Sequence, residues 1–261
     1  MNSIFTYWTL NPVAVLLLIL LITVFVRLNR FSWRKKLVPF IILLCLVITC
    51  FFSPLHILSS RYLFSAHMIV HVILLLLVGP FMVLSLPDNS FHSFFSLFRM
   101  HPLISWLAGV GIMWVWHIPV VFNKSMGDMN GGYNWMSLIE IFSLVVAGII
   151  FSSPVIHPGK SNRIPVLTGI LYLLTACIGC SVLGILISFA PAGTYHHYLS
   201  MHDDLGLNTV ITSRWNISQN TDQQIAGLIM WVPCCLIYVI ASMYLLYNWL
   251  NAKEPVKTIY S

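Results

Sequence analysis

Two histidines in an apolar stretch have the residue type and the spacing that suit a metal ion. His67 and His71 stand four residues apart, so on a helix both rings project over the same surface. Such a pair can hold a metal from a single helix. Imidazole side chains are costly inside a membrane, where they tend to face the bundle interior and mark function. Hydrogen bonding between helices accounts for the same spacing, and the pair alone is compatible with both interpretations.

A third histidine and a methionine fall at a similar predicted depth. The charged residues taken as markers of the outer membrane surface are Arg61, Lys124 and Asp222. With a helical rise of about 1.5 Å per residue, the depths below that surface are about 9 Å for His67, 10 Å for His117, 12 Å for Met230 and 15 Å for His71. Imidazole together with thioether suits copper, and sulfur favours Cu(I). We therefore expect a polar pocket lined by His67 and His117.

The stretch TDQQIAGLIMWVP, residues 221–233, places polar groups at the start of the last apolar run. Thr221 is expected to accept a hydrogen bond from the backbone N–H of Gln224, as in a capping box. Asp222 complements the positive start of the helix. Asp222, Gln223 and Met230 are also expected to form one wall of this pocket.

Glu140 is an acid near the outer end of another apolar run. It is expected to pair with a histidine or shuttle a proton inside the membrane, or to serve as a simple acid at a helix start. His196 and His197 stand beside tyrosines in the interval 191–221, where a loop or interfacial role is favoured. That interval could lie over the pocket.

The elements that must position these residues are membrane-spanning helices. The chain has 261 residues, of which 59% are hydrophobic and 8% charged, with a mean hydropathy of +0.89. These values are typical of integral membrane proteins. Runs near the spanning length of about 20 residues lie at 12–28, 37–54, 62–86, 102–122, 134–152, 165–190 and 222–250. We predict an all-α, polytopic bundle of seven transmembrane helices, forming one domain over residues 1–261.

The basic residues predict the orientation of the bundle, because Lys and Arg accumulate on the cytoplasmic side of membrane proteins. With the N-terminus outside and the C-terminus cytoplasmic, ten basic residues fall inside and three outside. The inner set is Arg27, Arg30, Arg34, Lys35, Lys36, Arg99, Lys160, Arg163, Lys253 and Lys257; the outer set is Arg61, Lys124 and Arg214. The net charge of +6 is then explained by topology, and no nucleic acid is needed as a partner.

The six cysteines all fall inside predicted spans, which is not the pattern of a disulfide framework. Cys177 and Cys180 share a helix face and could bind a soft metal. Cysteine in the middle of a membrane is more often small apolar filler, and we favour filler here.

Three segments closely resemble the CtaG family of cytochrome c oxidase assembly factors. They are AHMIVHVILLLLVGPFMVLSLP with its two histidines, WHIP with His117, and DQQIAGLIMWVP. The matches run in order from about residue 55 to about residue 245. The resemblance implies a multi-pass protein of the bacterial cytoplasmic membrane that helps to assemble haem–copper oxidases by handling copper. Carried over by position, it implies His67, His71 and His117 as ligands, with Asp222 and Met230 as nearby candidates.

The fifth predicted span departs from the family pattern. Members often carry Glu-His early in this span, followed by an apolar run and a glycine; here Glu140 is followed by Ile141, and the run ends at Gly148. The aromatic pair expected after the run is replaced by Ser152 and Ser153. The metal site must therefore have fewer nitrogen ligands, or use Glu140 or a loop histidine in place of the missing one. Otherwise this branch of the family has a different function.

Two functions from different classes fit these residues. The first is an assembly factor that binds copper at the outer face and hands it to an oxidase subunit. The alternative is a haem-binding membrane redox protein that uses histidine axial ligands, with His67 and His117 at matched depth. A retinal protein is disfavoured because no lysine lies in the seventh span before Lys253. We do not expect an enzyme, because HExxH, GxSxG and phosphate-loop motifs do not occur.

Overall fold

The computed structural model describes residues 7–10, 12–29, 33–87, 102–126, 135–157, 163–191, 193–195, 198, 203 and 205–251. Every regular element in these ranges is a helix, which confirms the all-α prediction. The longer elements are α1 (Pro12–Leu28), α2 (Trp33–Phe51), α4 (Phe64–Ile73), α5 (Gly79–Ser85), α10 (Trp135–Ile156), α11 (Val166–Phe189) and α14 (Gln219–Asn251). The shorter α-helices are α3 (Pro54–Ile57), α7 (Pro102–Trp106), α8 (Ile112–Trp116), α9 (Pro119–Ser125) and α13 (Leu207–Thr209). Wider π turns form η2 (Leu58–Tyr62), η3 (Leu74–Val78), η4 (Leu107–Gly111) and η6 (Val210–Arg214).

Four helices of the described chain are long and apolar enough to cross a membrane. They are Phe64–Ser85, Trp135–Ile156, Val166–Phe189 and Gln219–Asn251, close to four of the predicted spans. Two bent pairs, Trp33–Phe51 with Pro54–Tyr62 and Pro102–Trp116 with Pro119–Ser125, raise the number to six if each pair is one span. The first predicted span corresponds to α1, an apolar helix of 17 residues. The count of seven and the orientation of the termini stay predictions.

Proline explains the sharper of the two bends. The pair Pro102–Trp116 and Pro119–Ser125 turns by 75°. Ile118 precedes Pro119 and has an extended backbone with φ −63° and ψ 123°. The proline ring disfavours the helical conformation in the residue before it. The helix therefore stops at His117, and α9 starts again in a new direction.

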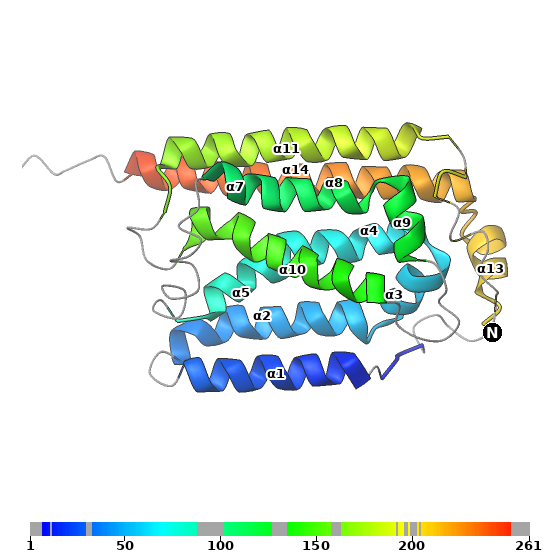
Figure 1. Cartoon of the computed structure of the whole chain (residues 1–261), viewed down its shortest axis with the longest axis horizontal. Helices are drawn as coiled ribbons and strands as arrows, with labels where there is room; N and C mark the ends of the chain where they lie inside the picture. Colours follow the sequence, from blue (N-terminus) through cyan, green and yellow to red (C-terminus); the bar gives the residue numbers. More distant parts are fainter. Residues whose placement is uncertain are drawn as a thin grey trace, which may run out of the picture.

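The helices lie roughly side by side, with α1 and α2 at one edge and α11 and α14 at the other (Figure 1). We call the end of the bundle that carries α3, α9 and α13 the α13 end; it is the end predicted to face outward (Figure 1). At the α11–α14 edge the two backbones approach closely, since a Cβ on Gly184 would lie 2.6 Å from the carbonyl oxygen of Gly227. All six cysteines are free thiols, and the Cys235 thiol packs beside Ser181 at this contact.

A second close approach sets the register of α10 against the continuous span formed by α4, η3 and α5. A Cβ on Gly79 would lie 2.4 Å from the carbonyl carbon of Gly148, so only glycine fits this crossing. Both helices run away from the α13 end in the same direction (Figure 1). His71 and Glu140 each precede their crossing glycine by eight residues. At about 1.5 Å per residue, both therefore lie about 12 Å from the crossing, at the same level.

Candidate metal centre

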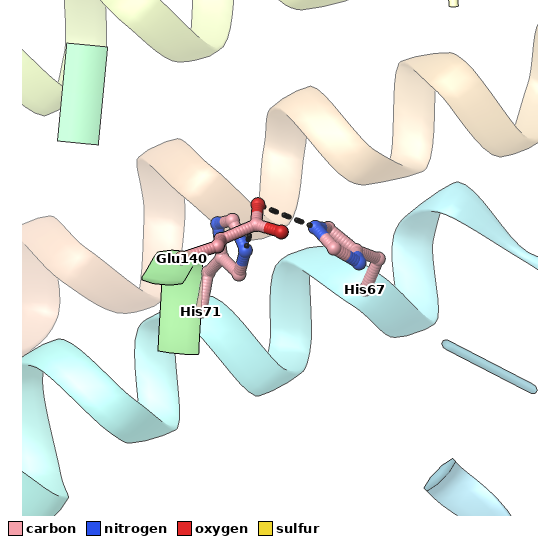
Figure 2. Close-up of side chains that lie close together, drawn as sticks. All are labelled: His67, His71 and Glu140. Atoms are coloured by element: carbon pink, nitrogen blue, oxygen red, sulfur yellow. Dashed lines mark ion pairs between the residues drawn. The ribbon is translucent and has the colours of Figure 1, made fainter. Parts of the chain in front are cut away.

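Two histidines and one glutamate converge in the interior of the bundle. The Nε2 atoms of His67 and His71 lie 3.4 Å and 3.1 Å from the same carboxylate oxygen, Oε1 of Glu140. Figure 2 shows the carboxylate reaching from α10 toward both rings on α4. One ligand atom from each residue lies within 4.8 Å of the others. The prediction that Glu140 pairs with a histidine is confirmed.

The donor set of this trio suits a borderline first-row transition metal. Imidazole nitrogen and carboxylate oxygen together ligate zinc, copper and iron. His71 and Glu140 have side chains that are each 2% exposed. Nevertheless His67 Nε2, His71 Nδ1 and Glu140 Oε1 are buried without a hydrogen-bond partner among the described residues. Buried polar atoms normally have partners, so Nε2 of His67 and Oε1 of Glu140, which face each other at 3.4 Å, are available as ligands to an ion.

Asp222 positions the histidine helix and does not join the trio. Leu63 gives α4 no side-chain cap. Asp222, reaching across from α14, accepts instead from the backbone N–H of Phe64 at 2.7 Å and of Ser65 at 3.1 Å, and from the Ser65 hydroxyl. A carboxylate at a helix N-terminus satisfies orphan N–H groups and complements the dipole. The family resemblance implied Asp222 as a nearby ligand candidate, but its carboxylate already accepts from these donors.

The start of α14 also differs from the predicted capping box. The helix begins at Gln219, and the N–H of Thr221 donates to the hydroxyl of Ser218 at 3.2 Å. Thr221 is therefore inside the helix rather than at its cap. Gln223 donates from Nε2 to the carbonyl oxygens of Ile187 and Ala190, at 3.1 Å and 2.7 Å, where α11 ends. Consecutive residues of the stretch 221–233 thus cap two neighbouring helices.

Met230 and His117 lie in the core without belonging to the trio. Met230 is fully buried in the apolar core. The ring of His117 lies 5.2 Å from that of His71, centroid to centroid and at right angles. Its Nδ1 donates to the backbone carbonyl of Met113 at 2.6 Å, and its Nε2 faces the sulfur of Met68 at 2.9 Å. The third and fourth predicted spans do bring the imidazoles of His71 and His117 together. Nε2 of His117, however, points at the Met68 sulfur and not at the trio.

Tyr195 and Tyr198, from the predicted loop, pack over this region at the α13 end, and the Tyr198 hydroxyl donates to the carbonyl oxygen of Ser59 at 2.7 Å. Tyr195 donates from its hydroxyl to the carbonyl oxygen of His117 at 3.0 Å, and its ring stacks on Phe64 at 4.6 Å. Burial raises the pKa of Tyr195 to about 12, so the hydroxyl keeps its proton at neutral pH and can donate. His196 and His197, to which we assigned a loop role, lie outside the described residues.

A cavity of about 400 Å³ borders the trio. It extends along the bundle from His67, His71 and Glu140 to residues near the α13 end, among them Ser59, Arg61 and Leu205. Because the same cavity touches the ligand atoms and the end of the bundle, an ion has room to approach the trio from that end.

Glu140 was expected at the metal only as one substitute for the missing fifth-span histidine, and Met68 had no predicted role. The available signal for Glu140 was an acid within an apolar run, where a charge is costly unless it is paired. Met68 stands between two histidines in HMIVH. The sequence placed Met68 on the same helix as His67 but gave no partner for its sulfur, because that partner, His117, comes from a different span.

Comparison with protein-family models matches residues 15–252 to the cytochrome c oxidase caa3 assembly factor family. Comparison with curated proteins and with solved structures returned no match. The family match covers nearly the whole chain, including the trio, the bend at His117 and the stretch 221–233. The resemblance seen in the sequence is thereby confirmed, and the chain belongs to the caa3-type, or CtaG, family of cytochrome c oxidase assembly factors.

Proposed function

We propose that this chain binds a copper ion through His67, His71 and Glu140 and hands it to a haem–copper cytochrome c oxidase during assembly in the bacterial cytoplasmic membrane. Membership of an oxidase assembly family supports the choice of recipient. The donor set supports copper as cargo, because imidazole ligands suit this metal. The observation that carries the proposal is the approach of two buried Nε2 atoms to one carboxylate oxygen at 3.4 Å and 3.1 Å.

The arrangement suits cargo that must be released. Three protein ligands leave a coordination position open, as in sites that exchange a ligand. The adjoining cavity gives that open position a route toward the α13 end. A ligand of the recipient protein can therefore bind the metal before His67, His71 and Glu140 dissociate from it.

The charge of Glu140 has a defined part in this scheme. A copper ion in the membrane interior is costly unless nearby groups offset its charge. Glu140 supplies a negative charge from α10, while the two histidines supply neutral nitrogen donors from α4. The glycine crossing of Gly79 with Gly148 and the cap from Asp222 hold these two helices at the register that the site needs.

The haem-binding alternative has weaker support. Axial histidines must face each other across the haem plane, whereas His67 and His71 project from the same helix with ring centroids only 4.2 Å apart. His117, the candidate from another span, directs its Nε2 toward Met68. A Soret band in the purified protein would favour haem over copper cargo.

Metal binding by the purified protein tests the proposal. Wild-type protein in detergent is titrated with Cu(I) against a chelator of known affinity, together with His67→Ala, His71→Ala and Glu140→Gln. Each substitution is expected to weaken binding by at least about tenfold, since even the loss of groups that only orient metal ligands costs about 10–100-fold. His157→Ala is the matched control, because His157 is also buried but lies beyond the other end of α10.

Oxidase maturation links this binding to function. Cells that express each variant are assayed for cytochrome c oxidase activity and for copper in the isolated oxidase. We expect the three site variants to lower both, and His157→Ala to leave both near wild type. Equal copper affinity in all four variants, or normal oxidase in cells that carry His71→Ala, would rule out the trio as the copper site.

A further inference from the structure

We propose that His117 and Met68 form a second, softer station for Cu(I) beside the trio, so that the cargo has two adjacent binding positions. This inference rests on the proposed copper function and adds a site to it. It is carried by the contact between His117 Nε2 and the Met68 sulfur at 2.9 Å.

The hydrogen-bonding pattern of His117 leaves a lone pair directed at a sulfur atom. A backbone carbonyl can only accept, so Nδ1 must carry the proton that is donated to Met113 at 2.6 Å. In the neutral ring, Nε2 then has a lone pair and no proton. The thioether of Met68 has no proton to donate either. Two acceptors therefore face each other in the core, and a soft cation bound to both atoms from one side would turn both lone pairs into ligands.

The alternatives that keep this contact without an ion are costly. If Nε2 carried the proton, Nδ1 would direct its lone pair at the Met113 carbonyl only 2.6 Å away. If both nitrogens carried protons, the ring would be a cation, yet His117 is 2% exposed and Met68 is fully buried. An isolated charge in such surroundings is strongly disfavoured. A thioether and an imidazole together match the preference of Cu(I).

The backbone holds His117 in this position by means that do not depend on a metal. The helix ends at His117 because Pro119 forces Ile118 into an extended conformation. Tyr195 fixes the peptide of His117 by donating to its carbonyl oxygen at 3.0 Å. The ring is therefore oriented by the bend and by two hydrogen bonds, which is how a ligand is preorganised.

The second station lies next to the first. The rings of His71 and His117 are 5.2 Å apart between centroids, and Met68 follows His67 on α4. Both ligands of the second station are neutral, whereas the trio includes a carboxylate. Cu(I) can pass from one set of ligands to the other by ligand exchange, with no change in oxidation state and no bond made or broken in the protein.

X-ray absorption at the copper edge tests the second station directly, because it reports which elements surround the metal. Purified full-length protein is loaded with Cu(I) under anaerobic conditions as wild type, Met68→Leu and Met82→Leu. Leucine replaces methionine at a cost below about 1.5 kcal/mol. Met82 is the control because it lies on the same span, 14 residues further along and about 21 Å away. His117→Asn, which removes the other ligand, is measured alongside.

We expect a sulfur neighbour of copper in wild type and Met82→Leu that is lost in both Met68→Leu and His117→Asn, while nitrogen and oxygen neighbours remain. Copper surrounded only by nitrogen and oxygen in wild type would overturn the second station and leave the trio intact. A sulfur neighbour that survives in Met68→Leu would also overturn it. Wild-type protein that takes up no copper would overturn both sites together.

Discussion

Replacing Asp222 by asparagine separates its capping role from a role as a metal ligand. The carboxylate accepts from the N–H groups of Phe64 and Ser65 with different oxygens. An asparagine amide keeps one oxygen, so in either orientation one of these N–H groups faces an NH₂ group. The helix loses an acceptor and the negative charge at its N-terminus, but the side-chain volume hardly changes.

The expected loss of stability follows from these contacts. A hydrogen bond to a charged group contributes about 1.5–3 kcal/mol. The interaction of a charge with a helix N-terminus adds about 0.3–1 kcal/mol. The sum is about 2–4 kcal/mol, which corresponds to a fall in the melting temperature of roughly 5–15 °C for a chain of this size. Asp203→Asn is the matched control, because Asp203 caps the short α13 helix outside the spans.

Thermal unfolding in detergent, followed by circular dichroism, measures this change, and copper titration of the same samples measures binding. Asp222→Asn is expected to melt well below wild type and below Asp203→Asn, yet to bind one copper ion at the trio when copper is saturating. An unchanged melting temperature together with a loss of copper would refute the capping assignment and make Asp222 a ligand.

Three further predictions concern the framework around the site. Gly148→Leu should abolish accumulation of folded protein, because a Cβ at Gly148 would lie 2.4 Å from a backbone oxygen of the neighbouring span. Gly111→Ala should be tolerated, because a Cβ at Gly111 would have no neighbouring atom within 4 Å. Expression level and gel filtration distinguish the two variants. Tyr195→Phe removes the hydrogen bond to the His117 carbonyl and should cost about 1 kcal/mol, seen as a slightly lower melting temperature. Gln223→Leu removes the side-chain donor from two carbonyls at the end of α11, of which that of Ile187 keeps only the backbone N–H of Ala190 at 3.4 Å. It should lower the melting temperature more than Tyr195→Phe, and the reverse order would contradict the capping of α11.

The histidine pair and most of the span limits could be predicted because they depend on local pattern. Spacing of four residues places His67 and His71 on one helix face whatever the rest of the fold does. Apolar runs predicted four long helices to within a few residues. The bend before Pro119 also has a local cause, although the run 102–122 reads as one continuous span by composition.

The partners across helices could not be predicted, because helical rise gives depth but not direction. Asp222 was expected to form part of the pocket wall, yet its carboxylate turns toward the start of α4. His117 reached the expected level, yet the bend directs its free nitrogen toward Met68. Glu140 meets the histidines because two glycines fix the register of α10. Contacts of this kind depend on packing between segments far apart in the sequence.

Anomalous diffraction at the copper edge from crystals of the copper-loaded protein tests the central claim most directly. We expect a peak between the Nε2 atoms of His67 and His71 and the carboxylate of Glu140, absent in crystals of Glu140→Gln prepared in the same way. A map with no peak near these three side chains, or with copper bound only at exposed surface residues, would contradict it.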